Sequence, residues 1–439
     1  MKAGAATEII NNDLGTKIQG AHSFYEVKYI RDDLEANALW LESNDNGVLF
    51  IGVDLGMLDL DYVQRILPDI AKAANVPAEC IMIGCSHTHS SPCVVETHPD
   101  KPIDEVYHER LREWLCRVAR EAVSSAEQVT VAWGKGQTEI GYNRRVCYAD
   151  GEHQMHGDPN RPDATGLEGC ADPQHTALFV RDMEGTLKAI FQHNTSHPVN
   201  FYCTDFLSAD FPGQSRKYLR EALGDIPIVF FNGAQGDISI FDEAWKDRSV
   251  EPAEQRVART AHLMTGETLR LLQHADFKDE LAIGHTKTRH EVDLRPLSAE
   301  RLEWCRKEMA DYQAGKKPWD LMTGCVAYMT LLYHDQFGDS KTETIDLHAG
   351  HIDDLSFVSV PCELFCHFAL QAKRRSPFAA TILLGLTNGS MGYCPTMEGL
   401  VGGSHEGTVK LTSRWDVNAG YLIVDELCRM LYALHADNA

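Results

Sequence analysis

The chain has 439 residues, of which 44% are hydrophobic and 24% are charged, and its formal net charge is −23 at pH 7. These proportions are typical of a globular protein, and the acidic balance argues against nucleic acid or an anionic membrane surface as the main partner. No run of about 18 apolar residues is present that would span a membrane, and residues 1–15 lack the apolar core of a secretory signal.

The cysteines indicate the redox compartment. There are 13 of them, scattered along the chain without a CxxC pair. An odd number in a long chain without a leader sequence is typical of reduced thiols, so we expect a cytoplasmic protein. Neither a repeat nor a linker divides the chain, and we therefore expect one α/β domain over residues 1–439.

The first elements form a unit of strand, helix and strand. Residues 47–55 are almost all apolar, which favours a central strand buried on both faces. Residues 60–74 have helical spacing, and Ile81-Met82-Ile83-Gly84-Cys85 again predicts a buried strand. Asp54, at the end of the first strand, either faces a pocket at this edge or caps a turn.

Two histidines follow the second strand, in the segment Ser86-His87-Thr88-His89. In an extended chain, residues two apart point to the same side, so His87 and His89 are expected to face one site. Ligand sites of open α/β sheets favour the ends of strands. An isolated pair of this kind is most often a polar turn, and the rest of the chain decides between the two interpretations.

The middle of the chain alternates helix, strand and loop. Residues 107–126 predict an amphipathic helix, and residues 129–139 predict a strand. Residues 148–173 are rich in Asp, Gly, Pro and His, and they predict a long surface loop with solvated histidines. Residues 177–180 and 187–192, separated by a glycine-containing turn, predict a β-hairpin.

Polar residues recur wherever a later strand ends. Apolar runs end next to His197, next to Gln235 in a glycine-rich turn, at Glu363 and before Tyr393. Two imidazoles and one carboxylate from separate strand ends are the ligands of a catalytic zinc ion with an open position. Because these residues lie far apart in the sequence, their spacing alone is a weak signal.

Residues 250–337 are expected to be mostly helical, as an insertion that caps a substrate pocket. The later part is rich in Trp, Met and Tyr, which would either line that pocket or form an ordinary helical core. Residues 421–434 predict a closing amphipathic helix. The predicted architecture is a central mixed β-sheet flanked by helices, with a zinc site at the strand ends.

An ordered set of motifs resembles one known family. The set consists of His-Thr-His-Ser at 87–90, Asn143-Arg144, His197-Pro198, Gly236-Asp237-Ile238-Ser239, Pro361-Cys362-Glu363 and Gly392-Tyr393. In this order the motifs resemble the N-terminal catalytic domain of the neutral/alkaline, non-lysosomal ceramidases, which are zinc-dependent amidases of α/β fold. The resemblance extends from about Gly52 to Gly407.

The resemblance implies a role for each motif. The zinc ligands would be His87, His197, Glu363 and Tyr393. His89 would bind the substrate or the attacking water, and Arg144 would contact a polar group or the developing oxyanion. Arg145 takes the place of Arg144 if the register is shifted by one.

The chain departs from the family pattern at substrate-facing positions. Gln235 stands where the family has its catalytic serine, and His405 replaces a tyrosine, so both are predicted catalytic residues here. The chain also ends where the family's C-terminal β-domain begins, and it lacks the secretion signal of extracellular members. We therefore expect a small polar substrate rather than ceramide.

These observations predict a zinc-dependent hydrolase that cleaves an amide, an ester or a lactone in a small water-soluble metabolite. A zinc-dependent lyase or isomerase acting on a sugar-like or keto compound is the alternative within enzymes. The third hypothesis is a protein that binds a metal without catalysing a reaction. The expected partner is the small-molecule substrate, and we expect neither nucleic acid nor a membrane as a partner. The sequence leaves open whether the chain forms a homo-oligomer.

Overall fold

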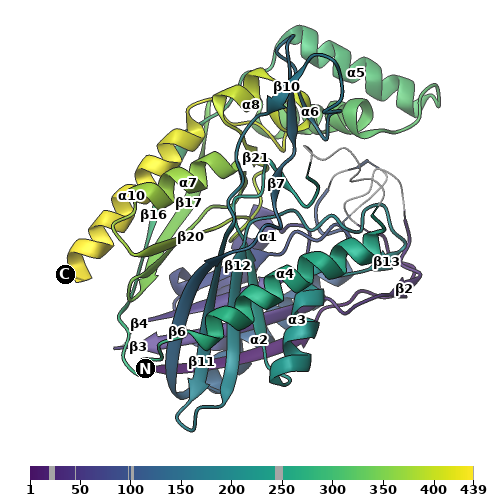
Figure 1. The fold of residues 1–439 in the computed structure, drawn as a ribbon. Helices are drawn as coiled ribbons and strands as arrows, with labels where there is room; N and C mark the ends of the chain where they lie inside the picture. The colour runs from purple at the N-terminus through teal and green to yellow at the C-terminus, as the bar shows by residue number, and fades with distance from the viewer. Residues whose placement is uncertain (19–24, 45, 97, 100–102, 243–250, 439) are drawn as a thin grey trace.

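The computed structural model describes residues 1–18, 25–44, 46–96, 98–99, 103–242 and 251–438. Its largest element is an eight-stranded mixed sheet (Figure 1). In spatial order the strands are β14 (Ile228–Asn232), β12 (Leu187–Asn194), β11 (Gln174–Asp182), β6 (Glu127–Gln137), β1 (Lys2–Ile9), β3 (Glu35–Ser43), β4 (Asn46–Val53) and β5 (Ile81–Cys85). The pairs β12/β14 and β4/β5 are parallel, whereas the other neighbours are antiparallel.

A second sheet packs on the first. It contains β16 (Ile283–Asp293), β17 (Thr342–Ile352), β18 (Leu355–Ser359) and β20 (Ala380–Leu384). Phe50 of β4 lies 5.3 Å from Phe357 of β18 and 5.1 Å from Phe191 of β12 between ring centroids. These aromatic side chains belong to one buried cluster that fills the space between the two sheets.

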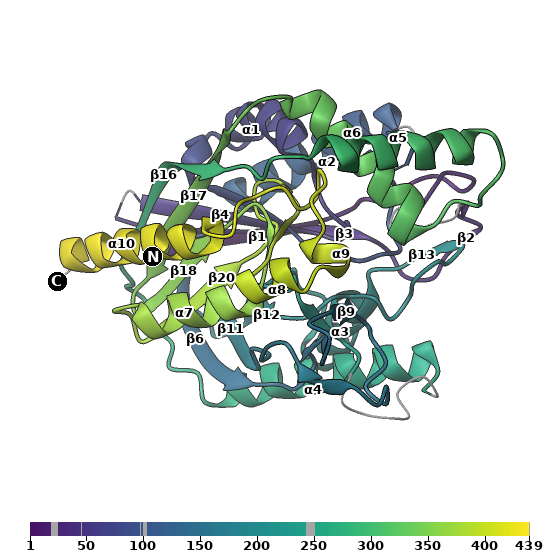
Figure 2. The same cartoon turned by 90° about the horizontal axis from the view of Figure 1, so that it is seen from above.

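Helices cover the outer face of each sheet. On the large sheet, α1 and α2 pack over the half that contains β5, and α3 and α4 over the half that contains β14 (Figure 2). On the second sheet lie α7 and α10. The helices are α1 (Leu60–Ala74), α2 (Glu105–Ser124), α3 (Asp210–Leu223), α4 (Ala253–Gln273), α7 (Cys366–Arg375) and α10 (Ala419–Asn438).

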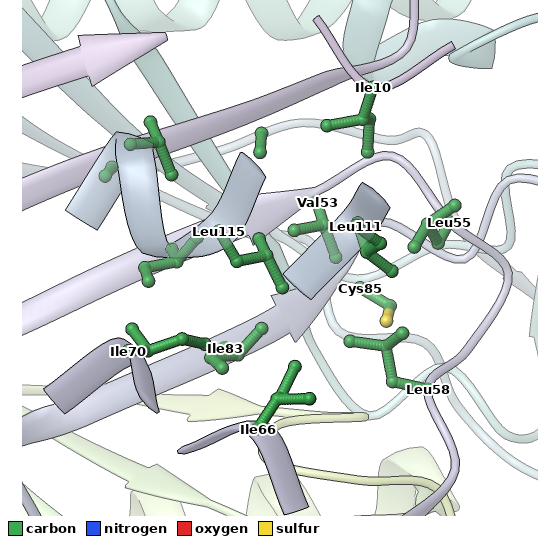
Figure 3. Packing of buried hydrophobic residues seen from close by; sticks show 14 of the residues in the cluster. Ile10, Val53, Leu55, Leu58, Ile66, Ile70, Ile83, Cys85, Leu111 and Leu115 are labelled. Atoms are coloured by element: carbon green, nitrogen blue, oxygen red, sulfur yellow. The ribbon is translucent and has the colours of Figure 1, made fainter. Parts of the chain in front are cut away.

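Helical spacing of apolar residues explains how α1 and α2 bind the sheet. Ile66 and Ile70 of α1 and Leu111 and Leu115 of α2 lie one turn apart in each helix, and all are fully buried (Figure 3). They pack on Ile83 of β5 and its neighbours. This packing anchors β5, the strand that leads to the histidine pair.

The large sheet curls until its two edge strands approach each other. A side chain at Gly52 of β4 would lie 2.5 Å from the Phe230 carbonyl oxygen of β14, and one at Gly84 of β5 would overlap the Phe231 ring. Both positions therefore require glycine. Because of this approach, the ends of β5 and β14 lie near each other although they are opposite edges of the sheet.

The segment after β20 connects these two edges. The Gly385 amide donates to the Asn232 carbonyl over 3.0 Å, and the Asn388 amide donates to the Ile83 carbonyl over 2.8 Å. The side-chain amide of Asn388 also pairs with the backbone of Ile81 and Ile83. Strand ends from both sheets thus meet at one place.

The predicted α/β class, with a central mixed sheet and flanking helices, is confirmed. The helices expected at 60–74, 107–126 and 421–434 are α1, α2 and α10, and the expected hairpin is β11–β12. Among the described residues no helix combines the length and apolar character needed to cross a bilayer.

The region 250–337 differs from a single helical insertion. Of this range, residue 250 lies outside the described chain. It holds helices, as expected, but α4 belongs to the large sheet, and the long strand β16 starts the second sheet. Only α5 (Ala299–Gln313) and α6 (Val326–Phe337) form a cap (Figure 1). The strand was missed because this edge strand carries polar residues on both faces, so its sequence lacks an apolar alternation.

The predicted surface loop at 148–173 is also partly ordered as sheet. Within it, β9 (His153–Met155) and β10 (Ala164–Leu167) pair on either side of β8 (Arg145–Tyr148). These strands are only three or four residues long, and a neighbouring segment stabilises them: the His153 amide donates to the Gly402 carbonyl. Such tertiary contacts leave no signal in a local pattern.

Candidate metal centre and active site

Short parallel pairing brings two of the predicted ligands together. The two-residue strands β19 (Glu363–Leu364) and β21 (Tyr393–Cys394) run parallel, with Glu363 opposite Tyr393. The Glu363 amide donates to the Gly392 carbonyl over 2.8 Å. Directly opposed residues of a ladder project their side chains to the same face, so Glu363 and Tyr393 face one site.

His87 reaches this site from a strained loop rather than from an extended strand. β5 ends at Cys85, and His87 has a φ of 72°, in the left-handed region that non-glycine residues rarely occupy. Its amide donates to the Leu55 carbonyl over 2.9 Å. The prediction that His87 and His89 lie on one face of an extended strand is therefore wrong, because the backbone is not extended at His87. Their rings nevertheless lie near each other, with centroids 5.0 Å apart.

The imidazoles of His87 and His197 point their Nε2 atoms at each other. These atoms are 3.0 Å apart, and they lie 3.3 and 3.5 Å from Oε2 of Glu363. Each ring is fixed from behind: Nδ1 of His87 donates to the Gly56 carbonyl, and Nδ1 of His197 donates to the Gln235 carbonyl over 2.9 Å. Bonds of this kind select the tautomer whose Nε2 carries a lone pair.

This arrangement fits a bound cation. Two lone pairs and a carboxylate oxygen that converge at about 3 Å repel one another unless a positive charge lies between them. Oε2 of Glu363 is buried, and none of the described residues donates a hydrogen bond to it. Burial, Arg144 and the neighbouring imidazoles also lower the pKa of His197 well below its ordinary value. The ring is therefore neutral, as a metal ligand must be.

Two overlapping ligand sets share these histidines. His87, His89 and His197 have ring nitrogens that all lie within 4.8 Å of one another, and this cluster could hold a metal ion. The set predicted from the sequence replaces His89 by Glu363 and adds Tyr393. Nε2 of His197 and the Tyr393 hydroxyl are both close to Arg144, at 3.2 Å from Nη1 and 3.4 Å from Nη2.

Arg144 is held rigidly beside the site by a buried ion network. Its Nε donates to Glu406 over 2.9 Å and its Nη2 to the Gly236 carbonyl over 2.9 Å. Arg145 pairs with the other oxygen of Glu406 and with Glu168. Arg144 lines the cavity, whereas Arg145 does not. Of the two candidates, Arg144 is therefore the one that faces the cavity, and its substrate contact stays a prediction.

A cavity of about 430 Å³ opens above these groups. Its floor includes His87, His197, Glu363, Tyr393 and Arg144. The wall is mostly apolar, and it is formed by Met57, Met155, Val199, Tyr202, Phe241, Trp319, Leu321 and Met329. Met329 belongs to α6 of the cap, and Trp319 and Leu321 lie in the segment that joins α5 to α6. The aromatic and Met-rich segment therefore lines the pocket, and other side chains of it pack in a helical core.

His89 and His405 flank the site on two sides. The His89 ring is half-buried, and its centroid lies 5.6 Å from that of His197. His405 precedes Glu406 in α9 (Ser404–Gly407), and its ring centroid lies 5.5 Å from that of Tyr393. Both line the cavity, so both imidazoles are placed to exchange protons with a bound molecule.

Gln235 occupies a different place from the one predicted. Its side chain is fully buried and does not line the cavity; a side chain at Gly385 would lie 2.8 Å from its Oε1. The contact with the site comes from its carbonyl, which holds His197. In this geometry Gln235 contacts the candidate site through its backbone carbonyl, and its catalytic role stays a prediction.

Several cavity residues carry no signal in the sequence. Lys410 lines the cavity although it is only 1% exposed, and burial lowers its pKa to about 8. His156 also lines the cavity, although the sequence predicted a solvated loop histidine. Asp54, in contrast, forms an ion pair with Arg216 away from the site. Lysines are usually solvated, so a single buried one cannot be recognised from its neighbours in sequence.

Comparison with known proteins supports the fold. No family model and no curated protein sequence matches the chain. The neutral ceramidase from Pseudomonas aeruginosa matches it with a TM-score of 0.73 and 14% identity, over 99% of this chain and 74% of that one. A ceramidase complexed with C2 matches with a TM-score of 0.73 and 13% identity, over 99% and 75%. The chain has a ceramidase-like fold, as the ordered motifs predicted.

Proposed function

We propose that the protein is a zinc-dependent hydrolase that cleaves an amide, or a related ester or lactone, in a small water-soluble molecule. The observation that carries this proposal is the convergence of two imidazole lone pairs and one buried carboxylate oxygen at the floor of a cavity. Imidazole and carboxylate are ligands that zinc accepts in catalytic sites. The ceramidase-like fold supports the hydrolase class.

The residues that would hold zinc are His87, His197, Glu363 and Tyr393. A bound zinc ion supplies Lewis acidity to a carbonyl oxygen and makes a water molecule acidic enough to attack near neutral pH. Arg144 cannot turn away from the site, because Glu406 and the Gly236 carbonyl fix its guanidinium group. A cation so fixed stabilises negative charge that develops on the substrate oxygen.

The two flanking imidazoles would move the protons. His89 lies beside His87 and His197, where it can take a proton from the attacking water. His405 lies on the side of Tyr393, where it can give a proton to the leaving group. The apolar wall would hold a hydrocarbon part of the substrate and exclude water from the reacting bond.

The size of the cavity supports a small substrate. About 430 Å³ is near the lower end of the roughly 300–1,000 Å³ found for small-molecule sites. We therefore propose that a long-chain lipid is a poor substrate. The same cavity has a substantial apolar wall, so the preferred compound combines a polar reacting bond with an apolar group.

A hydrolysis screen tests the proposal. Purified protein, stripped with EDTA and reloaded with zinc, is assayed against short-chain amides, esters and lactones and against long-chain ceramide. We expect zinc-dependent cleavage of at least one small compound, and no cleavage by the His197→Ala variant. Elimination or isomerisation products without hydrolysis would move the protein to the lyase or isomerase class. Efficient turnover of ceramide would overturn the proposed substrate class.

A further inference from the structure

Lys410 places a buried cation inside the cavity. Its side chain is 1% exposed and lines the same space as His87, Glu363 and Tyr393. The ammonium group donates to the carbonyl oxygen of His405. No ion pair among the described residues includes Lys410, and one carbonyl contact uses only one of its three donors.

The backbone holds this lysine in place. Residues 410–413 form a tight turn, in which the Lys410 and Ser413 amides donate to each other's carbonyls over 3.1 and 2.9 Å. The Leu411 amide donates to the Met329 carbonyl of α6 over 3.0 Å. Arg295 braces the same turn through the carbonyls of Gly407 and Ser413. A buried ammonium group with no carboxylate partner is costly, and a rigid turn prevents its escape to solvent.

The nearby carboxylates are already used by other groups. Glu406 binds Arg144 and Arg145, and Glu168 binds Arg145, so these two acids balance the two guanidinium groups. Glu363 faces the imidazole pair. None of these three acids forms an ion pair with Lys410. Arg144, which the resemblance assigns to a polar group of the substrate or to the developing oxyanion, already donates to Glu406 and to a backbone carbonyl.

We infer that Lys410 binds a carboxylate of the substrate next to the scissile bond, and that the substrate class is an acylated amino acid. The inference rests on the proposed function, because it places this carboxylate on the molecule cleaved at the same site. The Lys410 ammonium and the Arg144 guanidinium both lie 5.8 Å from the Tyr393 ring centroid. A carboxylate at Lys410 is thus close to the reacting centre. The apolar wall takes the acyl group.

The test measures binding without turnover. N-hexanoylglycine and its neutral analogue N-hexanoylglycinamide are titrated calorimetrically into the EDTA-treated protein. Omitting the metal removes any binding of the carboxylate to zinc. We expect the carboxylate to bind at least about tenfold more tightly than the amide, as for a charge-assisted hydrogen bond in a buried site.

Variants assign this preference to one side chain. K410M removes the charge and keeps an unbranched apolar chain, and it should bring the affinity ratio of the two probes close to one. K410R should retain part of the preference. The matched control is K188M, at a half-exposed surface lysine that pairs with Glu127, and it should leave the ratio unchanged.

Each outcome decides the inference. Equal affinities of the wild-type protein for the two probes would overturn it, as would an unchanged ratio in K410M. If thermal unfolding shows that K410M does not fold, two other measurements decide the inference. These are the affinity ratio of the two probes for the wild-type protein and the decrease of that ratio in K410Q. Because no reaction occurs in this experiment, a failed hydrolysis screen and a failed carboxylate preference are separate results.

Discussion

His197 shows how the backbone orients a single side chain of the candidate metal site. Its Nδ1 donates to the Gln235 carbonyl, and its Nε2 faces Nε2 of His87 at 3.0 Å. His193, four residues earlier in β12, is equally buried, but its Nε2 contacts the Leu383 carbonyl instead. Two buried histidines of one segment therefore have different roles, and the hydrogen-bond partners distinguish them.

Replacing His197 by alanine should abolish zinc binding. The change removes one of the two imidazoles common to both ligand sets, so we expect near-complete loss of metal after dialysis, measured by plasma emission spectroscopy. His193→Ala is the matched control, because it removes a buried imidazole outside the cluster and should leave zinc stoichiometric. Stoichiometric zinc in the His197 variant would show that the site is wrongly assigned.

His89→Ala separates the two ligand sets. If Glu363 and Tyr393 complete the metal site, this variant keeps its zinc and loses turnover by roughly 10²-fold, as for a general acid–base group. Metal content and the turnover of a substrate found in the screen are measured on the same sample. Loss of zinc would instead make His89 a ligand, and unchanged turnover would remove it from the mechanism.

Glu406 is expected to stabilise the fold in a pH-dependent manner. Burial by itself would raise its pKa, but Arg144 and Arg145 lower it from 4.5 to about 2. Because the pKa is lower in the folded state, the stabilisation is present above pH 4.5 and is lost as the pH falls toward 2. The shift corresponds to roughly 3 kcal/mol.

Urea unfolding of Glu406→Gln tests this expectation. At pH 7 the variant should lose about 3 kcal/mol or more of unfolding free energy, since it leaves buried guanidinium charge uncompensated. The difference from the wild-type protein should narrow as the pH falls below 4.5. Glu426→Gln, at an ion pair with Arg429 on α10, should cost less than about 1 kcal/mol. Equal losses in the two variants would contradict the assigned role of Glu406.

At the scale of elements, the site depends on the segment that follows β20. This segment runs between the ends of β5 and β14, and Asn388 attaches it to β5. Its side chain accepts from the Ile83 amide over 2.8 Å and donates to the Ile81 carbonyl over 2.9 Å. Its φ of 60° lies in the left-handed region, which asparagine and glycine adopt most readily.

Two substitutions at Asn388 separate the contribution of its side-chain hydrogen bonds from that of its left-handed backbone conformation. Asn388→Gly keeps the backbone conformation and loses the side-chain bonds, so we expect a cost of about 1–2 kcal/mol in unfolding free energy. Asn388→Ala adds the strain of a left-handed alanine, about 1–2 kcal/mol more. Both values come from urea unfolding at pH 7. An alanine variant as stable as the glycine variant would show that this backbone strain is absent.

At the scale of the whole molecule, the site exists only when both sheets are assembled. His87 follows β5 and His197 follows β12 of the large sheet, whereas Glu363 lies in β19, just after β18 of the second sheet. Residues 276 positions apart in sequence, His87 and Glu363, lie 3.3 Å apart between side-chain atoms. The unfolded chain cannot bring these side chains together, so we expect metal binding and folding to be coupled.

Zinc should therefore raise the thermal stability of the whole protein. A ligand that binds only the folded state adds about 2.7 kcal/mol when its free concentration is 100 times Kd. We expect a higher midpoint in calorimetric scans with zinc than with EDTA, and no such difference for His197→Ala. An equal shift in that variant would indicate that the metal binds elsewhere.

The sequence by itself determined the types of most elements and named the residues of the candidate metal site. Apolar runs predict the buried strands and helical spacing predicts α1, α2 and α10, because both patterns reflect local geometry and burial. The order of the motifs, from His87 to Tyr393, predicted the ceramidase-like fold that the structural comparison confirms. The ligand roles of these residues remain predictions.

Tertiary structure alone decided how these residues meet and what surrounds them. β16 is a polar edge strand, Gln235 acts through its carbonyl, and Lys410 is buried by a turn that α6 and Arg295 hold. In each case the deciding contact joins segments far apart in the chain. A local pattern records the burial and spacing of its own residues, whereas a cavity, a charge balance and a ligand geometry arise only when distant strands pair.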